Sequence, residues 1–319
     1  MKRYLFIIFF LLSAPSFSAL VPEDGSMHVH GWVHSVVKTT WPKVQYEYSG
    51  IQDIDLLKEI FQSEGLILKT VEVETRLRQW FQDHLLFNDR GEFLQMAPIE
   101  YKILLDYPPS LSTFYTLDDR DVYNPFWIKN LAHKLGRPVK ELNVTRVEGG
   151  ELISGRREGK PYALIDENVI RRAQAQFKFS FDEAKRQVAQ DLEVEEENLL
   201  SLSIGEDFPT HIDTWMMALP NGKILIKKDS RFQAVIQKIK ESGFAVVEVS
   251  GEIKDVNFFN GFVVRSRKDN QLIVFTNKSQ NESLNYSWEK VLQAQGVVRV
   301  YFLGKWHPDA GIDCAGALF

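Results

Sequence analysis

The chain has 319 residues, of which 44% are apolar and 25% charged, and its formal net charge is −5. This is the composition of a globular protein, which excludes disordered, collagenous and coiled-coil chains, and the acidic balance gives no sign of nucleic-acid binding. The single cysteine, Cys314, excludes a disulfide within the chain and a cysteine-rich zinc site.

The first residues predict a secretory signal peptide. Two basic residues precede an apolar run over residues 4–12, and the small residues Ser16 and Ser18 suit cleavage after Ser18. The apolar run is much shorter than the ~20 residues of a membrane span, although an uncleaved anchor is the alternative. We therefore expect residues 1–18 to be removed and the mature protein to be secreted or periplasmic, without a membrane partner.

The region 19–110 gives the weakest pattern. A strand is expected over residues 29–38 and amphipathic helices over 53–63 and 75–86. His28, His30 and His34 share one face of the expected strand, but three histidines without a fourth ligand are a thin basis for zinc, and we expect no metal site. We interpret this region as an N-terminal elaboration, which could include a first unit of the repeat that follows.

The second half predicts one order of elements three times: two strands, a helix or helices, and a strand. The units begin near residues 148, 211 and 261, and a period of about 50 to 60 residues indicates a modular α/β architecture. The expected elements are strands 151–154 and 162–165, helices 167–177 and 181–191, strand 200–204; strands 211–218 and 223–227, helix 231–241, strand 244–249; strands 261–266 and 272–276, helix 284–293 and strand 297–303. Ser180 and Glu183 form the pattern of a capping box at the start of helix 181–191.

His211 and Asp213 are the first candidates for a reactive site. On the expected strand 211–218, alternation places both side chains on one face, where they could line one site. The alternative for the pair in isolation is an inert surface His-x-Asp sequence.

Three further motifs contain residues that could take part in chemistry. Glu148 precedes Gly149 and Gly150, where the backbone either turns sharply or approaches another group closely. A carboxylate cluster ends at Asp121, and Cys314 lies close to the C-terminus. An unpaired cysteine in an oxidising compartment indicates chemistry, unless it is a small buried apolar residue.

The order of these motifs resembles that of the guanidino-group-modifying (pentein) superfamily, most closely its protein-arginine deiminase and agmatine deiminase branch. In that family an Arg-Asp or Gln-Asp motif supplies the first guanidinium-binding carboxylate. The matching positions are Arg120-Asp121, Glu148-Gly149-Gly150, His211-Ile212-Asp213, Asn257 to Gly261 and Gly311-Ile312-Asp313-Cys314. Asp313 departs from the pattern, because many members have histidine there. The resemblance implies an α/β propeller of five ββαβ units around a pseudo-fivefold axis, with residues 111–319 as the catalytic core.

The resemblance also implies roles for these residues. Cys314 would attack the guanidinium carbon, His211 would donate the proton to the departing ammonia and then activate water, and Glu148 would orient His211. Asp121 and Asp213 would hold the planar cation from two sides, because a carboxylate matches its forked donors. The other expected substrate-binding residues are Arg120, Gly149 and Asn260.

We therefore expect a secreted deiminase that hydrolyses peptidyl-arginine in a partner protein to citrulline and ammonia. The alternatives are a deiminase of a small guanidine such as agmatine or arginine, an amidinotransferase with the same residues, a papain-like hydrolase that uses Cys314 and His211, and a non-catalytic arginine-binding protein. No cofactor is expected to be required. Calcium dependence stays open, since animal protein-arginine deiminases use calcium and their ligands are not recognisable in this sequence.

Overall fold

The computed structural model describes residues 31–37, 54–73, 86–88, 90–97, 129, 132–133, 136–203, 211–250, 257–303 and 316–318. The signal peptide and the residues predicted at 120, 121 and 314 lie outside these ranges. Among the helices in these ranges, none has the length and apolar content that a bilayer crossing requires.

The described residues form strands, α-helices and short 3-10 turns. The elements of its first part and its last strand are β1 (Gly31–Val37), α1 (Ile54–Ser63), β2 (Ile67–Val73), β3 (Leu86–Phe87), β4 (Phe93–Gln95), β5 (Val139–Glu141) and β15 (Gly316–Leu318). The elements between them are β6 (Leu152–Arg157), β7 (Lys160–Asp166), α5 (Glu167–Phe177), α6 (Phe181–Asp191), β8 (Leu199–Leu202), β9 (Met216–Leu219), β10 (Lys223–Lys227), α7 (Gln233–Glu241), β11 (Ala245–Val249), β12 (Phe262–Arg265), β13 (Leu272–Asn277), α8 (Glu282–Gln293) and β14 (Arg299–Leu303).

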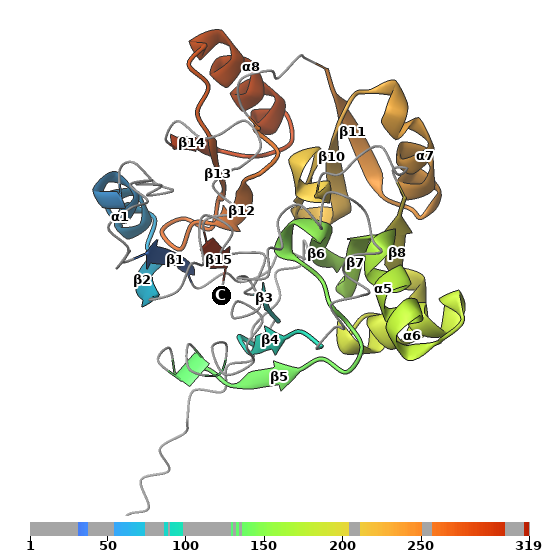
Figure 1. The fold of residues 1–319 in the computed structure, drawn as a ribbon. Helices are drawn as coiled ribbons and strands as arrows, with labels where there is room; N and C mark the ends of the chain where they lie inside the picture. The colour runs from blue at the N-terminus through green and yellow to red at the C-terminus, as the bar shows by residue number, and fades with distance from the viewer. Residues whose placement is uncertain are drawn as a thin grey trace, which may run out of the picture.

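The strands form five sheets of one pattern, in which a central strand pairs antiparallel on one side and parallel on the other. The sheets are β15–β1–β2, β3–β4–β5, β6–β7–β8, β9–β10–β11 and β12–β13–β14. In Figure 1 they follow one another around the picture, from β1 and β2 on the left through β4 and β5 at the bottom to β13 and β14 at the top. The architecture is thus α/β with mixed sheets.

The first sheet joins distant parts of the chain. Its antiparallel strand is β15, in which Leu318 lies opposite Trp32 of β1. The second sheet likewise takes β3 and β4 from before residue 110 and β5 from after it, so strands from both sides of the predicted boundary at 110 share this sheet.

Most elements predicted in the second half agree with the structure. Helices 167–177 and 181–191 and strand 223–227 have the predicted bounds, and the Ser180 hydroxyl accepts the Glu183 N–H at 3.2 Å as the capping pattern predicted. Most of the predicted helix 75–86 lies outside the described residues.

The predicted strand 211–218 is wrong at its start. Residues 212–214 form a 3-10 turn and β9 begins only at Met216. The turn forms because the Thr214 N–H and hydroxyl both donate to the His211 carbonyl, at 3.1 and 2.6 Å, while Ile212 is buried in the core. Alternation along a strand therefore does not relate His211 to Asp213.

Neighbouring units share their hydrophobic cores. The third and fourth sheets meet in one cluster around Leu164 and Ile224, and the fourth and fifth in another around Leu225 and Val274. Leu86 of β3 packs against the core of the third unit, and β15 contacts β3. The third unit also has a cluster of its own, between its sheet and helices α5 and α6.

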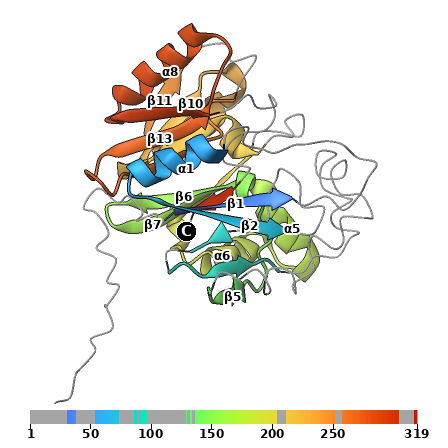
Figure 2. The ribbon, with the colours of Figure 1, turned by 90° about the vertical axis from the view of Figure 1, so that its left-hand side faces the viewer.

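Helix α1 of the first unit packs against the fifth sheet. Figure 2 shows it between β13 and the strands β1 and β2, and its buried residues Leu57 and Phe61 pack against Phe262 and Phe275. Phe61 and Phe275 have ring centroids 5.0 Å apart.

A buried carboxylate, Glu64, reinforces this contact just beyond α1. It accepts hydrogen bonds from Arg299 at 2.8 Å and from the Tyr301 hydroxyl, and its carbonyl accepts the Arg267 N–H at 2.9 Å. Burial opposes the charge of Glu64, but hydrogen bonds from Ser266, Tyr301 and Arg299 and the Arg299 charge outweigh that effect and lower its pKa.

We predict that Leu57→Ala destabilises the whole chain by about 2–5 kcal/mol, because it leaves a cavity between α1 and the fifth sheet. The control is Leu56→Ala, the same change at an adjacent residue that is 43% exposed, which should alter stability by only about 0.5 kcal/mol. Urea unfolding of both variants checks the expectation. Equal small effects would contradict the packing of α1 on the fifth sheet.

Candidate active site

Glu148 and His211 meet where the third and fourth units adjoin. Glu148 precedes the 3-10 turn Gly149–Glu151 at the start of β6, and His211 precedes the turn at the start of β9. The His211 Nε2 atom lies 3.1 Å from Glu148 Oε2. Glu148 is 5% exposed and His211 is half-buried, so the carboxylate fixes an imidazole that retains access to a ligand.

Gly150 leaves the space that the His211 ring occupies. A Cβ atom built on Gly150 would lie 2.1 Å from His211 Nδ1 and 2.4 Å from its Cγ. The ring thus rests against bare backbone, so the second glycine of the Glu-Gly-Gly sequence is a steric requirement of the histidine.

Asp213 and Asn260 form a second pair, across the fourth and fifth units. The Asn260 amide nitrogen donates to Asp213 Oδ2 at 2.6 Å, and both side chains are buried. The turn that carries Asp213 contacts the turn that follows Glu148. Two polar pairs from three successive units therefore belong to one region.

The loop that carries Asn260 is itself held by buried groups. The Asn277 amide donates to the Asn260 carbonyl at 3.2 Å, and Asn257 Oδ1 accepts the Asn260 N–H at 3.3 Å. Gly261 passes so close to β13 that a Cβ atom there would lie 2.4 Å from the Phe275 carbonyl oxygen. The Asn-Gly sequence is thus explained by packing at the start of β12.

A buried ion pair lies behind Glu148. Arg172 of α5 makes a two-pronged contact with the carboxylate of Glu151 and also donates to the Arg146 carbonyl at 3.1 Å. Glu151 in turn accepts the Glu148 N–H at 3.0 Å. Burial opposes the charge of Glu151, but the Arg172 charge and hydrogen bonds prevail and lower its pKa.

Asp166 is a further titratable group near this pair. It caps α5 by accepting the Asn168 N–H at 2.8 Å. Burial, followed by the negative charge of Glu151, raises the pKa of Asp166 to about 6.

Asp191, the last residue of α6, holds the segment that leads to Glu148. Its two carboxylate oxygens accept four hydrogen bonds at 2.8–2.9 Å, from the N–H groups of residues 143, 144 and 145 and the Asn143 amide. Burial opposes the charge of Asp191, but these hydrogen bonds outweigh it and lower its pKa.

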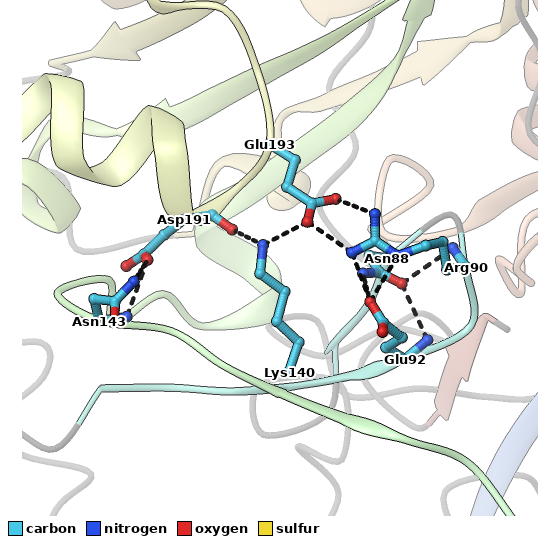
Figure 3. A network of polar contacts seen from close by, with 7 residues as sticks. All are labelled: Asn88, Arg90, Glu92, Lys140, Asn143, Asp191 and Glu193. Atoms are coloured by element: carbon cyan, nitrogen blue, oxygen red, sulfur yellow. Dashed lines mark hydrogen bonds and ion pairs between the residues drawn. The ribbon is translucent and has the colours of Figure 1, made fainter.

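Figure 3 shows how this anchor continues into the second unit. Lys140 of β5 donates to the Asp191 carbonyl at 2.7 Å and pairs with Glu193 at 2.8 Å, while Arg90 grips Glu193 with two nitrogens. Exposed ion pairs contribute little singly, so the buried carboxylate of Asp191 is the principal member of this network.

The structure thus places five of the predicted site residues and leaves three outside the described ranges. Glu148, Gly149, His211, Asp213 and Asn260 are described; Arg120, Asp121 and Cys314 are not. Sequence reasoning missed the residues that hold the Glu148 loop, which are Glu151, Arg172 and Asp191. Glu151 follows Glu148 by the three-residue spacing of a capping box and could have been found, whereas the other two come from distant helices with no local signal.

Within the described ranges, no group of three or more histidine, cysteine, aspartate and glutamate side chains could hold a metal ion.

Comparison with known proteins shows the fold. No protein-family model and no curated protein sequence matches the chain. Among solved structures, the agmatine deiminase of Enterococcus faecalis has a TM-score of 0.59 at 15% identity, covering 93% of this chain and 94% of that chain. The C. jejuni agmatine deiminase has 0.58 at 14%, with 93% and 94% covered, and DDAH from Pseudomonas aeruginosa 0.56 at 13%, with 92% and 100% covered. The chain therefore has an α/β fold with mixed sheets similar to that of the pentein deiminases.

Proposed function

We propose that this protein hydrolyses a small guanidine compound to a ureido product and ammonia. The observation that carries the proposal is the contact of His211 with Glu148 over Gly150, beside the buried Asp213–Asn260 pair. A fold similar to that of agmatine deiminases and DDAH supports this chemistry.

In the proposed reaction Cys314, as a thiolate, attacks the guanidinium carbon. The resulting adduct breaks a C–N bond, and ammonia leaves with a proton from His211, so that the carbon stays bound to sulfur. Water, deprotonated by His211, attacks the same carbon. The C–S bond then breaks and the added hydroxyl loses its proton, which the released ammonia takes up, so that the thiolate is restored and the neutral ureido product leaves. Asp213 supplies one carboxylate for the guanidinium, because a planar cation with forked donors is matched by a carboxylate.

Two similar structures support a cysteine as the nucleophile. One is a cysteine-to-serine mutant of the P. aeruginosa DDAH complexed with citrulline, and the other a cysteine-to-serine mutant of the C. jejuni agmatine deiminase with substrate bound. In this chain Cys314 is the single cysteine.

We propose a small guanidine in preference to peptidyl-arginine. The sequence motifs favoured a protein substrate, but the structural similarity is to agmatine deiminases and DDAH, which favours a small guanidine. We further propose that the five units close into the ring expected from the resemblance, which the contacts between successive units and between α1 and the fifth sheet support. Export through residues 1–18, and activity without a cofactor, complete the proposal.

Asp213 supplies one carboxylate for the guanidinium, and the order of the sequence motifs assigned the other to Asp121. The positions of site residues relative to the strands point to a different residue for that second carboxylate. Glu148, Asp213 and Asn260 each precede the antiparallel strand of a sheet by at most four residues, and Cys314 has the same sequence relation to β15. Before β3 the same range holds Gln82, Asp83 and His84, in which Asp83 is the carboxylate and Gln82-Asp83 gives the Gln-Asp form of the motif. The register therefore favours Asp83 for the role that motif order assigned to Asp121.

We predict that the chain from residue 19 onward produces a ureido compound from agmatine or free arginine, and that Cys314→Ala abolishes the product. A colorimetric ureido assay on agmatine, arginine, a blocked arginine amide and an arginine-containing protein, each with calcium or a chelator, checks this expectation. Product from the amide and the protein alone would restore the peptidyl-arginine hypothesis. No product from any substrate, with the chain folded, would refute guanidine hydrolysis.

We predict that Asp83→Asn lowers kcat/KM by about 100-fold or more, since an amide cannot supply the charge that pairs with the guanidinium. Asp121→Asn should change it by less than about threefold. Steady-state kinetics on the best substrate compares the two variants. The reverse order of effects would return the role to Asp121.

Gly150→Ala should lower kcat by about 100-fold, because the added methyl group displaces the His211 ring from its contact with Glu148. Kinetics and thermal unfolding are measured on the same preparation. A folded variant with wild-type kcat would show that the ring position is not required for turnover.

A further inference from the structure

Side chains of two helices, α5 and α6, form hydrogen bonds to the loop that carries Glu148. Arg172 on α5 binds the end of the loop through Glu151 and its middle through the Arg146 carbonyl. Asp191 at the end of α6 binds its beginning through the N–H groups of residues 143–145. The described part of each other unit has at most one α-helix, whereas the third unit has these two.

Both anchors are buried charges, so they are fixed in place. Arg172 and Asp191 are each 2% exposed, and Glu151 is 4% exposed. A buried charge must keep its partners, because the alternative is an uncompensated ion in a poorly solvating interior. The loop between the anchors therefore has little freedom to move away from the helices.

The anchors act on Glu148 through its own backbone. Glu151 accepts the Glu148 N–H at 3.0 Å, and the Glu148 carbonyl accepts the Glu151 N–H at 2.9 Å. With both of its backbone polar groups bound in this way, Glu148 directs its carboxylate across the unit boundary to His211. A displacement of the loop would break that contact.

We propose that Arg172, with its partner Glu151, and Asp191 are positioning residues that set the Glu148–His211 contact. None of them needs to touch substrate. The effect on turnover rests on the proposed function, whereas the effect on the contact itself does not.

The test uses variants that avoid leaving one buried charge alone. Glu151→Leu with Arg172→Met removes both charges and the acceptor for the Glu148 N–H. Glu151→Gln with Arg172→Met removes the charges but keeps an acceptor. The control is Arg171→Met on the same helix, where Arg171 is exposed and pairs with Glu167.

Asp191→Asn tests the second anchor. The amide group replaces an oxygen that accepts two hydrogen bonds with a group that only donates, so part of the segment 143–145 loses its acceptor. Its control is Asp182→Asn in the first turn of α6, where the side chain is exposed.

The first readout does not depend on catalysis. The ¹⁵N resonances of His211, assigned by comparison with His211→Gln, report its contact with Glu148. In the double variant Glu151→Leu with Arg172→Met, and in Asp191→Asn, these resonances should move towards their positions in Glu148→Gln. In the controls Arg171→Met and Asp182→Asn the resonances should match those of the wild type. Resonances unchanged in folded anchor variants would overturn the proposal whatever the enzyme assay shows.

The second readout is kinetic. We expect kcat to fall by about 10- to 100-fold in the same two variants with KM within about threefold, because a small displacement of a catalytic group slows the reaction without removing substrate contacts. The double variant Glu151→Gln with Arg172→Met should recover part of the lost kcat. Wild-type kcat in folded anchor variants would contradict the proposal, while an inactive wild type would count only against the proposed function.

Discussion

The packing of neighbouring units against one another is the constraint on which the described structure depends, because a sheet of three strands leaves a large apolar face to cover. The third, fourth and fifth units share apolar clusters, Leu86 of the second packs against the third, and α1 covers the fifth sheet. The first sheet is completed only by β15 from the other end of the chain. These contacts make the stability of the described units depend on their neighbours, and they bring the segments before β6, β9 and β12 together.

The residues of the candidate site lie on the segments where neighbouring units contact one another. Glu148, Asp213 and Asn260 each lie at most four residues before the antiparallel strand of a different sheet, so similar positions of the repeat supply different side chains to the candidate site. Glycines allow the close approach that this arrangement requires. Gly150 makes room for the His211 ring, and Gly261 lets the segment after Asn260 lie against β13.

The buried charges of Glu151, Arg172 and Asp191 are not explained by a contribution to folding stability alone. A buried ion pair is often no better than apolar residues of the same size, although the loss of one partner costs about 3–5 kcal/mol. The Glu151–Arg172 pair and the Asp191 carboxylate, however, satisfy backbone groups around Glu148 that no apolar side chain could satisfy. Such groups fix a loop in one conformation, and the 3.1 Å contact between Glu148 and His211 requires a fixed loop.

The sequence by itself determined the repeat, most element bounds in the second half, and the identity of Glu148, His211 and Asp213 as candidates. Those features depend on local periodicity, caps and short motifs, which neighbouring residues encode. Only the tertiary structure decided that a 3-10 turn follows His211, that β15 pairs with β1, and that Arg172 and Asp191 hold the Glu148 loop. Each of these depends on the burial of a side chain or on a contact between residues far apart in the chain, and no short stretch of sequence specifies either.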